Sequence, residues 1–169
     1  MIVIPTVPHT GTMFVADLFA RMKYKEVSFN DPLGIHTYFT CHLVKQSQVD
    51  QAVEKLKFCR AVVPLRHPCV VWESWKRKKM DFQPFQDAWL NLIKQIDPFN
   101  PCYLPIDSEK RDYYLWNLNH KLGLDIKTDW PVINSRSHTS HLIYQDLEED
   151  QSIVTFIQDI SCFINRFYG

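Results

Sequence analysis

Short apolar runs alternate with longer amphipathic segments along this chain. The apolar runs predict β-strands at residues 1–5, 37–44, 61–65 and 102–106. The segments between them repeat apolar residues every three or four positions, which predicts helices at residues 14–22, 47–58, 68–79, 85–96, 111–122 and 147–167. Because strands that alternate with helices form α/β proteins, we expect three layers, with a mostly parallel central sheet flanked by helices.

Length and charge narrow the class of protein further. A chain of 169 residues is long enough for one hydrophobic core, so we expect a single domain over residues 1–169. Its 46% hydrophobic and 22% charged residues are typical of a globular protein and exclude a disordered chain. The 19 basic residues balance the 19 acidic residues, so no overall field attracts nucleic acid.

The sequence also predicts a cellular location. No apolar run approaches the roughly 18 residues that cross a bilayer, and the first residues lack the pattern of a signal peptide. The five cysteines are odd in number and include no C-x-x-C pair, which favours reduced thiols over disulfides or a zinc cage. We therefore expect a cytoplasmic protein without a membrane segment.

A turn-rich loop, Thr6-Val7-Pro8-His9-Thr10-Gly11-Thr12, connects the first predicted strand to the first predicted helix. Free N–H groups at a helix N-terminus attract phosphate, and ligands of α/β sheets bind beyond the carboxyl ends of strands. The loop is not the ATP-binding G-x-x-x-x-G-K-[ST] sequence, because Gly11 is followed by Thr12 and Met13 rather than by lysine. Taken alone, the loop fits an ordinary strand-to-helix turn equally well.

Three segments within the first 80 residues together resemble the sulfotransferases that use 3′-phosphoadenosine 5′-phosphosulfate (PAPS), which have a P-loop-like fold. Residues 6–14 are similar to their T-Y-P-K-S-G-T-T-W loop, and Thr40-Cys41-His42-Leu43 is similar to their K-T-H-L strand. Residues 62–74 are similar to their V-x-R-N-P…S segment, with Arg66 and Ser74 eight positions apart. The rest of the chain matches only in its general run of helices and strands.

The resemblance implies a site for PAPS and for its product, adenosine 3′,5′-bisphosphate (PAP). In this alignment Arg66 and Ser74 bind the 3′-phosphate, which suits the paired N–H groups of arginine and the hydroxyl of serine. The residues that wrap the 5′-phosphosulfate are Thr10, Gly11, Thr12 and Met13.

Two histidines carry the chemistry that the resemblance implies. His42 matches the general base that takes the proton of the acceptor, a role suited to a side chain that titrates near neutral pH. His9 stands where the family usually has lysine, so a fixed positive charge on the leaving phosphate is replaced by one that depends on pH. Without the resemblance, His42 is more simply a hydrogen-bonded structural histidine.

The resemblance implies transfer of a sulfuryl group to a hydroxyl or amine on a small molecule or a macromolecule. No metal is required, because in-line positioning and neutralisation of the leaving oxygen do most of the catalysis. Two alternatives stay open. One is a non-catalytic nucleotide-binding or interaction protein on the same fold, and the other is a kinase-like phosphotransferase with a different donor.

Residues 127–141 have the least regular pattern and fit either a lid or a surface loop. Arg136 in this segment is a candidate for the C-terminal phosphate contact that cytosolic sulfotransferases have. His138 and His141 have the spacing of metal ligands but no carboxylate at ligand spacing, so we do not predict a zinc site.

Overall fold

The computed structural model describes residues 1–32, 34–130 and 150–169. In these ranges five strands form one sheet in the order β2-β3-β1-β4-β5, and each neighbouring pair is parallel. The predicted α/β class with a parallel sheet is therefore confirmed. The strands are β1 (Ile2–Thr6), β2 (Lys25–Glu26), β3 (Thr37–His42), β4 (Arg60–Leu65) and β5 (Cys102–Pro105).

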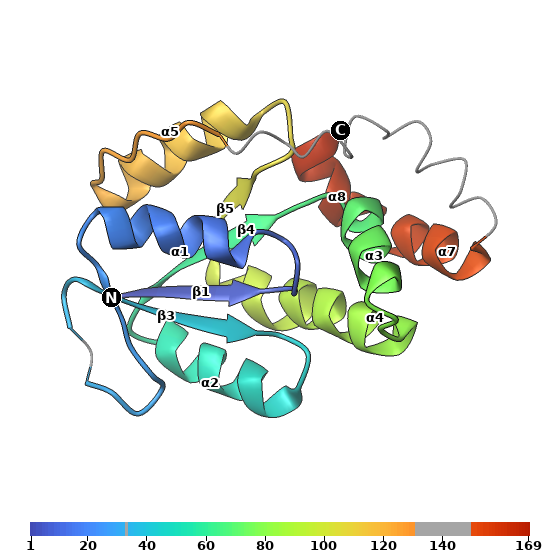
Figure 1. The fold of residues 1–169 in the computed structure, drawn as a ribbon, viewed down its shortest axis with the longest axis horizontal. Coiled ribbons are helices and arrows are strands. Elements are labelled where there is room, and N and C mark those ends of the chain that lie inside the picture. Colours follow the sequence, from blue (N-terminus) through green and yellow to red (C-terminus); the bar gives the residue numbers. More distant parts are fainter. Residues whose placement is uncertain (33, 131–149) are drawn as a thin grey trace.

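Helices cover both faces of the sheet and give the three predicted layers (Figure 1). One face packs against α1 (Thr12–Arg21) and α5 (Arg111–Leu122). The helices on the other face are α2 (Gln46–Leu56), α3 (Pro68–Arg77), α4 (Phe82–Asn91), α7 (Gln151–Asp159) and α8 (Ser161–Tyr168). None of the helices in the described residues combines the length and apolar character that a membrane span requires.

Strand β1 shows why the sheet needs both layers. All five of its residues are buried, and successive side chains of a strand point to opposite faces. Ile2 and Ile4 belong to the core beneath α1 and α5, whereas Val3 belongs to the core on the opposite face. A strand that is apolar on both sides is stable only with helices above and below it.

The C-terminal helix differs from the prediction of one helix over residues 147–167. The structure has two helices, α7 and α8, which meet at Ile160, and residues 147–149 lie outside the described range. The apolar spacing continues through Ile160, which is itself buried, so the sequence pattern does not reveal the break. After the break, Phe163 and Phe167 pack against the ring of Tyr103 on β5.

Two further elements differ from the sequence pattern. Strand β2 was not predicted, because its two residues are exposed and lack an apolar pattern; it pairs with Thr37 and Tyr38 of β3. The predicted helix over residues 85–96 begins earlier, as α4 at Phe82, and continues as a π-helix, η1 (Leu92–Ile96), and a 3₁₀ turn, η2 (Asp97–Phe99).

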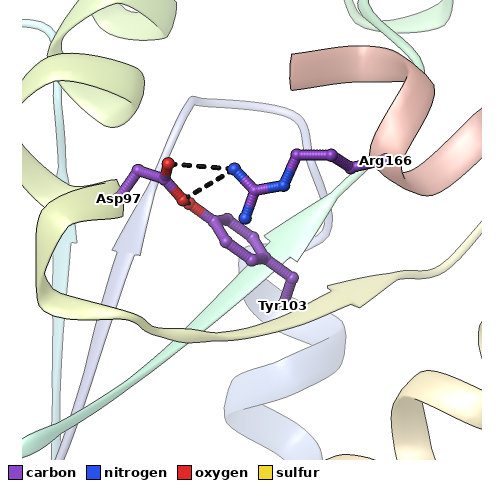
Figure 2. Close-up of polar contacts among 3 residues, drawn as sticks. All are labelled: Asp97, Tyr103 and Arg166. Atoms are coloured by element: carbon purple, nitrogen blue, oxygen red, sulfur yellow. Dashed lines mark hydrogen bonds and ion pairs between the residues drawn. The ribbon is translucent and has the colours of Figure 1, made fainter. Parts of the chain in front are cut away.

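A polar cluster fastens α8 to the rest of the protein. Figure 2 shows Arg166 of α8 beside Asp97 of η2, with Nη1 of Arg166 at 3.1 Å from Oδ1 and 2.9 Å from Oδ2. The hydroxyl of Tyr103 donates a hydrogen bond of 2.7 Å to Oδ1 of the same carboxylate. The guanidinium also lies over the rings of Tyr103, Phe163 and Phe167. We call Arg166, Asp97 and Tyr103 the anchor cluster.

Candidate functional site

The direction of the chain connections reverses at the middle of the sheet. From β1 the chain proceeds to β2 and β3 on one side, and from β4 it proceeds to β5 on the other. In open parallel sheets, ligands bind beyond the carboxyl ends of the strands at such a reversal. The residues that follow these strand ends include His9 after β1 and Arg66 after β4, and His42 is the last residue of β3. We call this end of the sheet the carboxyl edge.

The loop after β1 contains two residues with a positive φ. His9 has a φ of 71° and Gly11 a φ of 110°, both in the left-handed region. L-residues rarely adopt a φ of 110°, and a Cβ on Gly11 would also lie 2.5 Å from Cδ1 of Ile106, so a side chain at this position would strain the loop. Thr10 is fully buried, and its hydroxyl donates a 2.7 Å hydrogen bond to the carbonyl of Val7. The hydroxyl of Thr10 therefore stabilises the loop.

The loop leads directly into the N-terminus of α1. Gly11 is the N-cap residue and has no side chain that could accept a hydrogen bond from the first N–H groups of the helix. The first helical hydrogen bond runs from the amide of Val15 to the carbonyl of Gly11, at 3.1 Å. The hydroxyl of Thr12 is buried without a hydrogen-bond partner among the described residues, and the side chain of Met13 is 81% exposed.

His9 is held between the loop and α3. Its Nδ1 atom lies 3.1 Å from Oγ of Ser74, and its ring makes an edge contact with Trp75. The indole N–H of Trp75 donates a 3.1 Å hydrogen bond to the carbonyl of Pro8, which fixes the loop next to the helix. Burial lowers the pKa of His9 below its usual value. Electrostatic interactions with nearby basic side chains lower it further; these are Lys78, His42, Arg66 and Arg77. The imidazole is therefore neutral near pH 7 in the free protein.

His42 ends β3 beside the last residue of β1. Its register partner across the two strands is Thr6, and Nδ1 of His42 lies 2.9 Å from Oγ1 of Thr6. The amide of Leu43 donates a 2.9 Å hydrogen bond to the carbonyl of Thr6, so the two strand ends are also joined directly after the histidine. Partial burial lowers the pKa of His42, which keeps this imidazole neutral near pH 7 as well.

Arg66 follows β4 and is half-buried. Within residues 1–32, 34–130 and 150–169, its side chain makes no hydrogen bond and no ion pair. Its charge nevertheless acts on His9 across the carboxyl edge. A half-buried guanidinium without a partner is poorly solvated, and this favours binding of an anion.

The backbone next to Arg66 is fixed by Asp107, which sequence reasoning missed. Oδ2 of Asp107 accepts a 3.0 Å hydrogen bond from the amide of His67, and Oδ1 accepts one of 2.7 Å from the hydroxyl of Tyr168. Burial raises the pKa of Tyr168 well above its usual value, and the negative charge of Asp107 raises it further, so the phenol stays protonated and donates. Asp107 could have been found from its place two residues after β5, at the same edge of the sheet.

The structure thus brings several of the predicted site residues together. Ser74 contacts His9 directly, and electrostatic interactions connect His9 to both His42 and Arg66. The remaining candidates, Arg136, His138 and His141, lie outside the described residues. The described part of the chain contains no cluster of three or more metal-ligating side chains.

Comparison of the chain with family models, with curated proteins and with solved structures found no match.

Proposed function

We propose that the chain binds PAPS and PAP at the carboxyl edge and transfers the sulfuryl group to a hydroxyl or amine acceptor. One observation carries the proposal. Four polar residues lie in or next to the loop between β1 and α1, and Arg66 among them has no hydrogen-bond or ion-pair partner in the described residues. The other three are His9, His42 and Ser74.

The charges at this edge favour an anionic ligand. Arg77 and Lys78 lie three and four positions after Ser74, which places them on the same face of α3 or just beyond its end. Neither forms an ion pair within the described ranges, and both act on His9. Together with Arg66 they give a locally cationic edge in a chain of zero net charge, which suits the phosphates of PAP.

The proposed transfer is a single displacement at sulfur. The oxygen or nitrogen of the acceptor forms a bond to sulfur while the bond between sulfur and the bridging phosphate oxygen breaks, and its electron pair leaves with PAP. His42 accepts the proton that the acceptor loses and later releases it to water. Arg66 holds the 3′-phosphate, Ser74 contacts His9, and the α1 N-terminus and His9 face the phosphosulfate.

Binding without transfer is the second candidate function. It is favoured by the lowered pKa of His9, because the free protein lacks the permanent positive charge that a lysine would place on the leaving phosphate. This candidate predicts the same ligand and the same dependence on Arg66. It differs only in the absence of turnover.

A thermal-shift comparison of PAP, PAPS, ATP and ADP tests the proposed ligand. A ligand present at a hundred times its dissociation constant stabilises the folded protein by about 2.7 kcal/mol, so we expect a clear increase in Tm with PAP and PAPS. ATP and ADP, which lack the 3′-phosphate, should give a much smaller one. Equal shifts for all four would favour the kinase-like alternative, and no shift would contradict the proposal.

The variant Arg66→Ala should lose the shift with PAP, whereas Arg21→Ala should keep it. Arg21 is a matched control because it is an arginine at the far end of α1, paired with Asp17. Release of PAP from PAPS in the presence of a panel of phenols, alcohols and amines then separates the two candidate functions. If the protein transfers the sulfuryl group, release of PAP depends on the acceptor. If the protein only binds the nucleotide, no PAP is released.

A further inference from the structure

Two histidines at the carboxyl edge each have a hydroxyl group next to the Nδ1 atom of the ring. Oγ1 of Thr6 lies 2.9 Å from Nδ1 of His42, and Oγ of Ser74 lies 3.1 Å from Nδ1 of His9. In neither ring does Nε2 form a hydrogen bond with a residue in the described ranges. A neutral imidazole carries one proton, so the hydroxyl on Nδ1 determines whether Nε2 is a donor or an acceptor.

The two hydroxyls differ in their other contacts. A hydroxyl donates only once, and Thr6 has a second acceptor, the carbonyl of Cys41, to which its Oγ1 donates at 3.5 Å. Ser74 has no other hydrogen-bond acceptor than Nδ1 of His9 among the described residues. Thr6 can therefore accept a hydrogen bond from its histidine while it donates to Cys41, whereas the proton of Ser74 is directed at His9.

We propose that Thr6 and Ser74 hold the two histidines in opposite tautomers, which makes His42 a proton acceptor and His9 a neutral hydrogen-bond donor. In His42, Nδ1–H donates to Thr6, and the lone pair of Nε2 is free. In His9, Nδ1 accepts from Ser74, and the proton is on Nε2. Thr6 is then a positioning residue for His42. The assignment rests on the proposed function, because only a free Nε2 lets His42 act as a base while Thr6 occupies Nδ1.

The surroundings of Thr6 suit this role. Its side chain is fully buried at the end of β1, and the 2.9 Å hydrogen bond from Leu43 to its carbonyl fixes the register with β3 at that point. A buried hydroxyl in a fixed strand has little freedom to turn, so it selects one arrangement of the imidazole.

In this tautomer His9 can donate a hydrogen bond without carrying a positive charge. The family position usually holds lysine, whereas His9 is neutral near pH 7 because burial and the neighbouring cations lower its pKa. With its proton on Nε2, the neutral ring donates one hydrogen bond to an oxygen of the leaving phosphate. Such a bond is weaker than one from a charged group, so we expect slow turnover rather than none.

Nuclear magnetic resonance of the ligand-free, ¹⁵N-labelled protein tests the assignment directly. Two-bond ¹H–¹⁵N correlations distinguish the two neutral tautomers, and the spectra should be recorded near pH 8, above the usual pKa of about 6.5. His42→Gln and His9→Gln assign the two signals. We expect the proton on Nδ1 in His42 and on Nε2 in His9. Because neutral imidazole in water favours Nε2–H, finding that form in His42 would overturn the proposal.

Variants of Thr6 add a control that a purely structural role would not reproduce. Thr6→Val keeps the shape of the side chain and should move the proton of His42 to Nε2, whereas Thr6→Ser should keep it on Nδ1. Neither change should alter the tautomer of His9. An unchanged His42 signal in Thr6→Val would contradict the positioning role.

Turnover separates this inference from the proposed function. Thr6→Val should reduce kcat at least about tenfold and leave the affinity for PAP unchanged. Thr6→Ser, which keeps the hydroxyl, should have a kcat close to that of wild type. If wild type does not bind PAP, the proposed function fails, while the spectra still decide the tautomers. If transfer occurs with the proton of His42 on Nε2, the function stands and the inference fails.

Discussion

Two arginines in this protein have opposite surroundings. Arg166 in the anchor cluster is paired with Asp97 and lies over three aromatic rings. Arg66 at the carboxyl edge is half-buried and has no side-chain partner in the described residues. A folded chain usually pairs a partly buried charge, because desolvation without compensation destabilises it. The difference indicates that Arg166 stabilises the fold, whereas Arg66 is available to an anionic ligand.

The largest expected difference between the two regions is in turnover. Replacing His42 with glutamine removes the proposed base, so sulfuryl transfer should slow by about 10²–10⁴-fold while the affinity for PAP changes little. Initial rates with a productive acceptor, together with calorimetry of PAP binding, measure both quantities. The control is Arg166→Ala in the anchor cluster, which should keep the wild-type rate per folded molecule. Full activity in His42→Gln would exclude this histidine as the base.

Thermal unfolding distinguishes the two arginines by their effect on stability. Arg166→Ala loses an ion pair and a cation–π stack, which together contribute about 1–2 kcal/mol, so Tm should fall by about 2–8 °C. Arg66→Ala loses no hydrogen bond or ion pair with the described residues, and its stability should stay within about 0.5 kcal/mol of wild type. An equal loss in both variants would mean that Arg66 also has a structural partner.

The smallest expected effect is a dependence of PAP affinity on pH. Burial and the charges of Lys78, His42, Arg66 and Arg77 lower the pKa of His9 in the free protein, and Ser74 and Trp75 complete its surroundings. A bound phosphate favours imidazolium and raises that pKa, so binding takes up protons. Affinity should therefore increase several-fold as pH falls from about 8 to about 6. Below that range the phosphate itself gains a proton, since its second pKa is about 6.

The variant His9→Lys is the control for this pH dependence. Lysine keeps its charge throughout the range, so the affinity should become nearly constant with pH. Calorimetry in buffers of different ionisation enthalpy measures the number of protons taken up. Identical profiles for wild type and His9→Lys would show that His9 does not face the phosphate, and the dependence would then belong to His42 or His67.

The fold was largely predictable because its signals are local. Four of the five strands are apolar runs bounded by turn residues, and the main helices repeat apolar residues at helical spacing. The strand β2 was missed because its exposed residues, Lys25 and Glu26, carry no pattern of their own and form a strand only by pairing with β3. The break at Ile160 was missed because the apolar periodicity continues through it.

The candidate site was predictable only in part. His9, His42 and Arg66 stand next to predicted strand ends, and parallel strands bring such ends to one edge. Their partners depend on tertiary pairing between distant residues. Thr6 meets His42 across 36 positions, and Asp107 meets the amide of His67 across 40. No local pattern in the sequence predicts these contacts.

Calorimetry of PAP and adenosine 5′-monophosphate, which differ only by the 3′-phosphate, tests directly whether Arg66 binds that phosphate. In wild type, PAP should bind at least about tenfold more tightly than the monophosphate, because a charge-assisted contact contributes about 1.5–3 kcal/mol. In Arg66→Ala this ratio should fall to about one, while Arg166→Ala, measured at a temperature where it is folded, should keep the wild-type ratio. Arg66 does not bind the 3′-phosphate if Arg66→Ala discriminates between the two nucleotides as well as wild type does, and the proposed site is wrong if wild type binds neither.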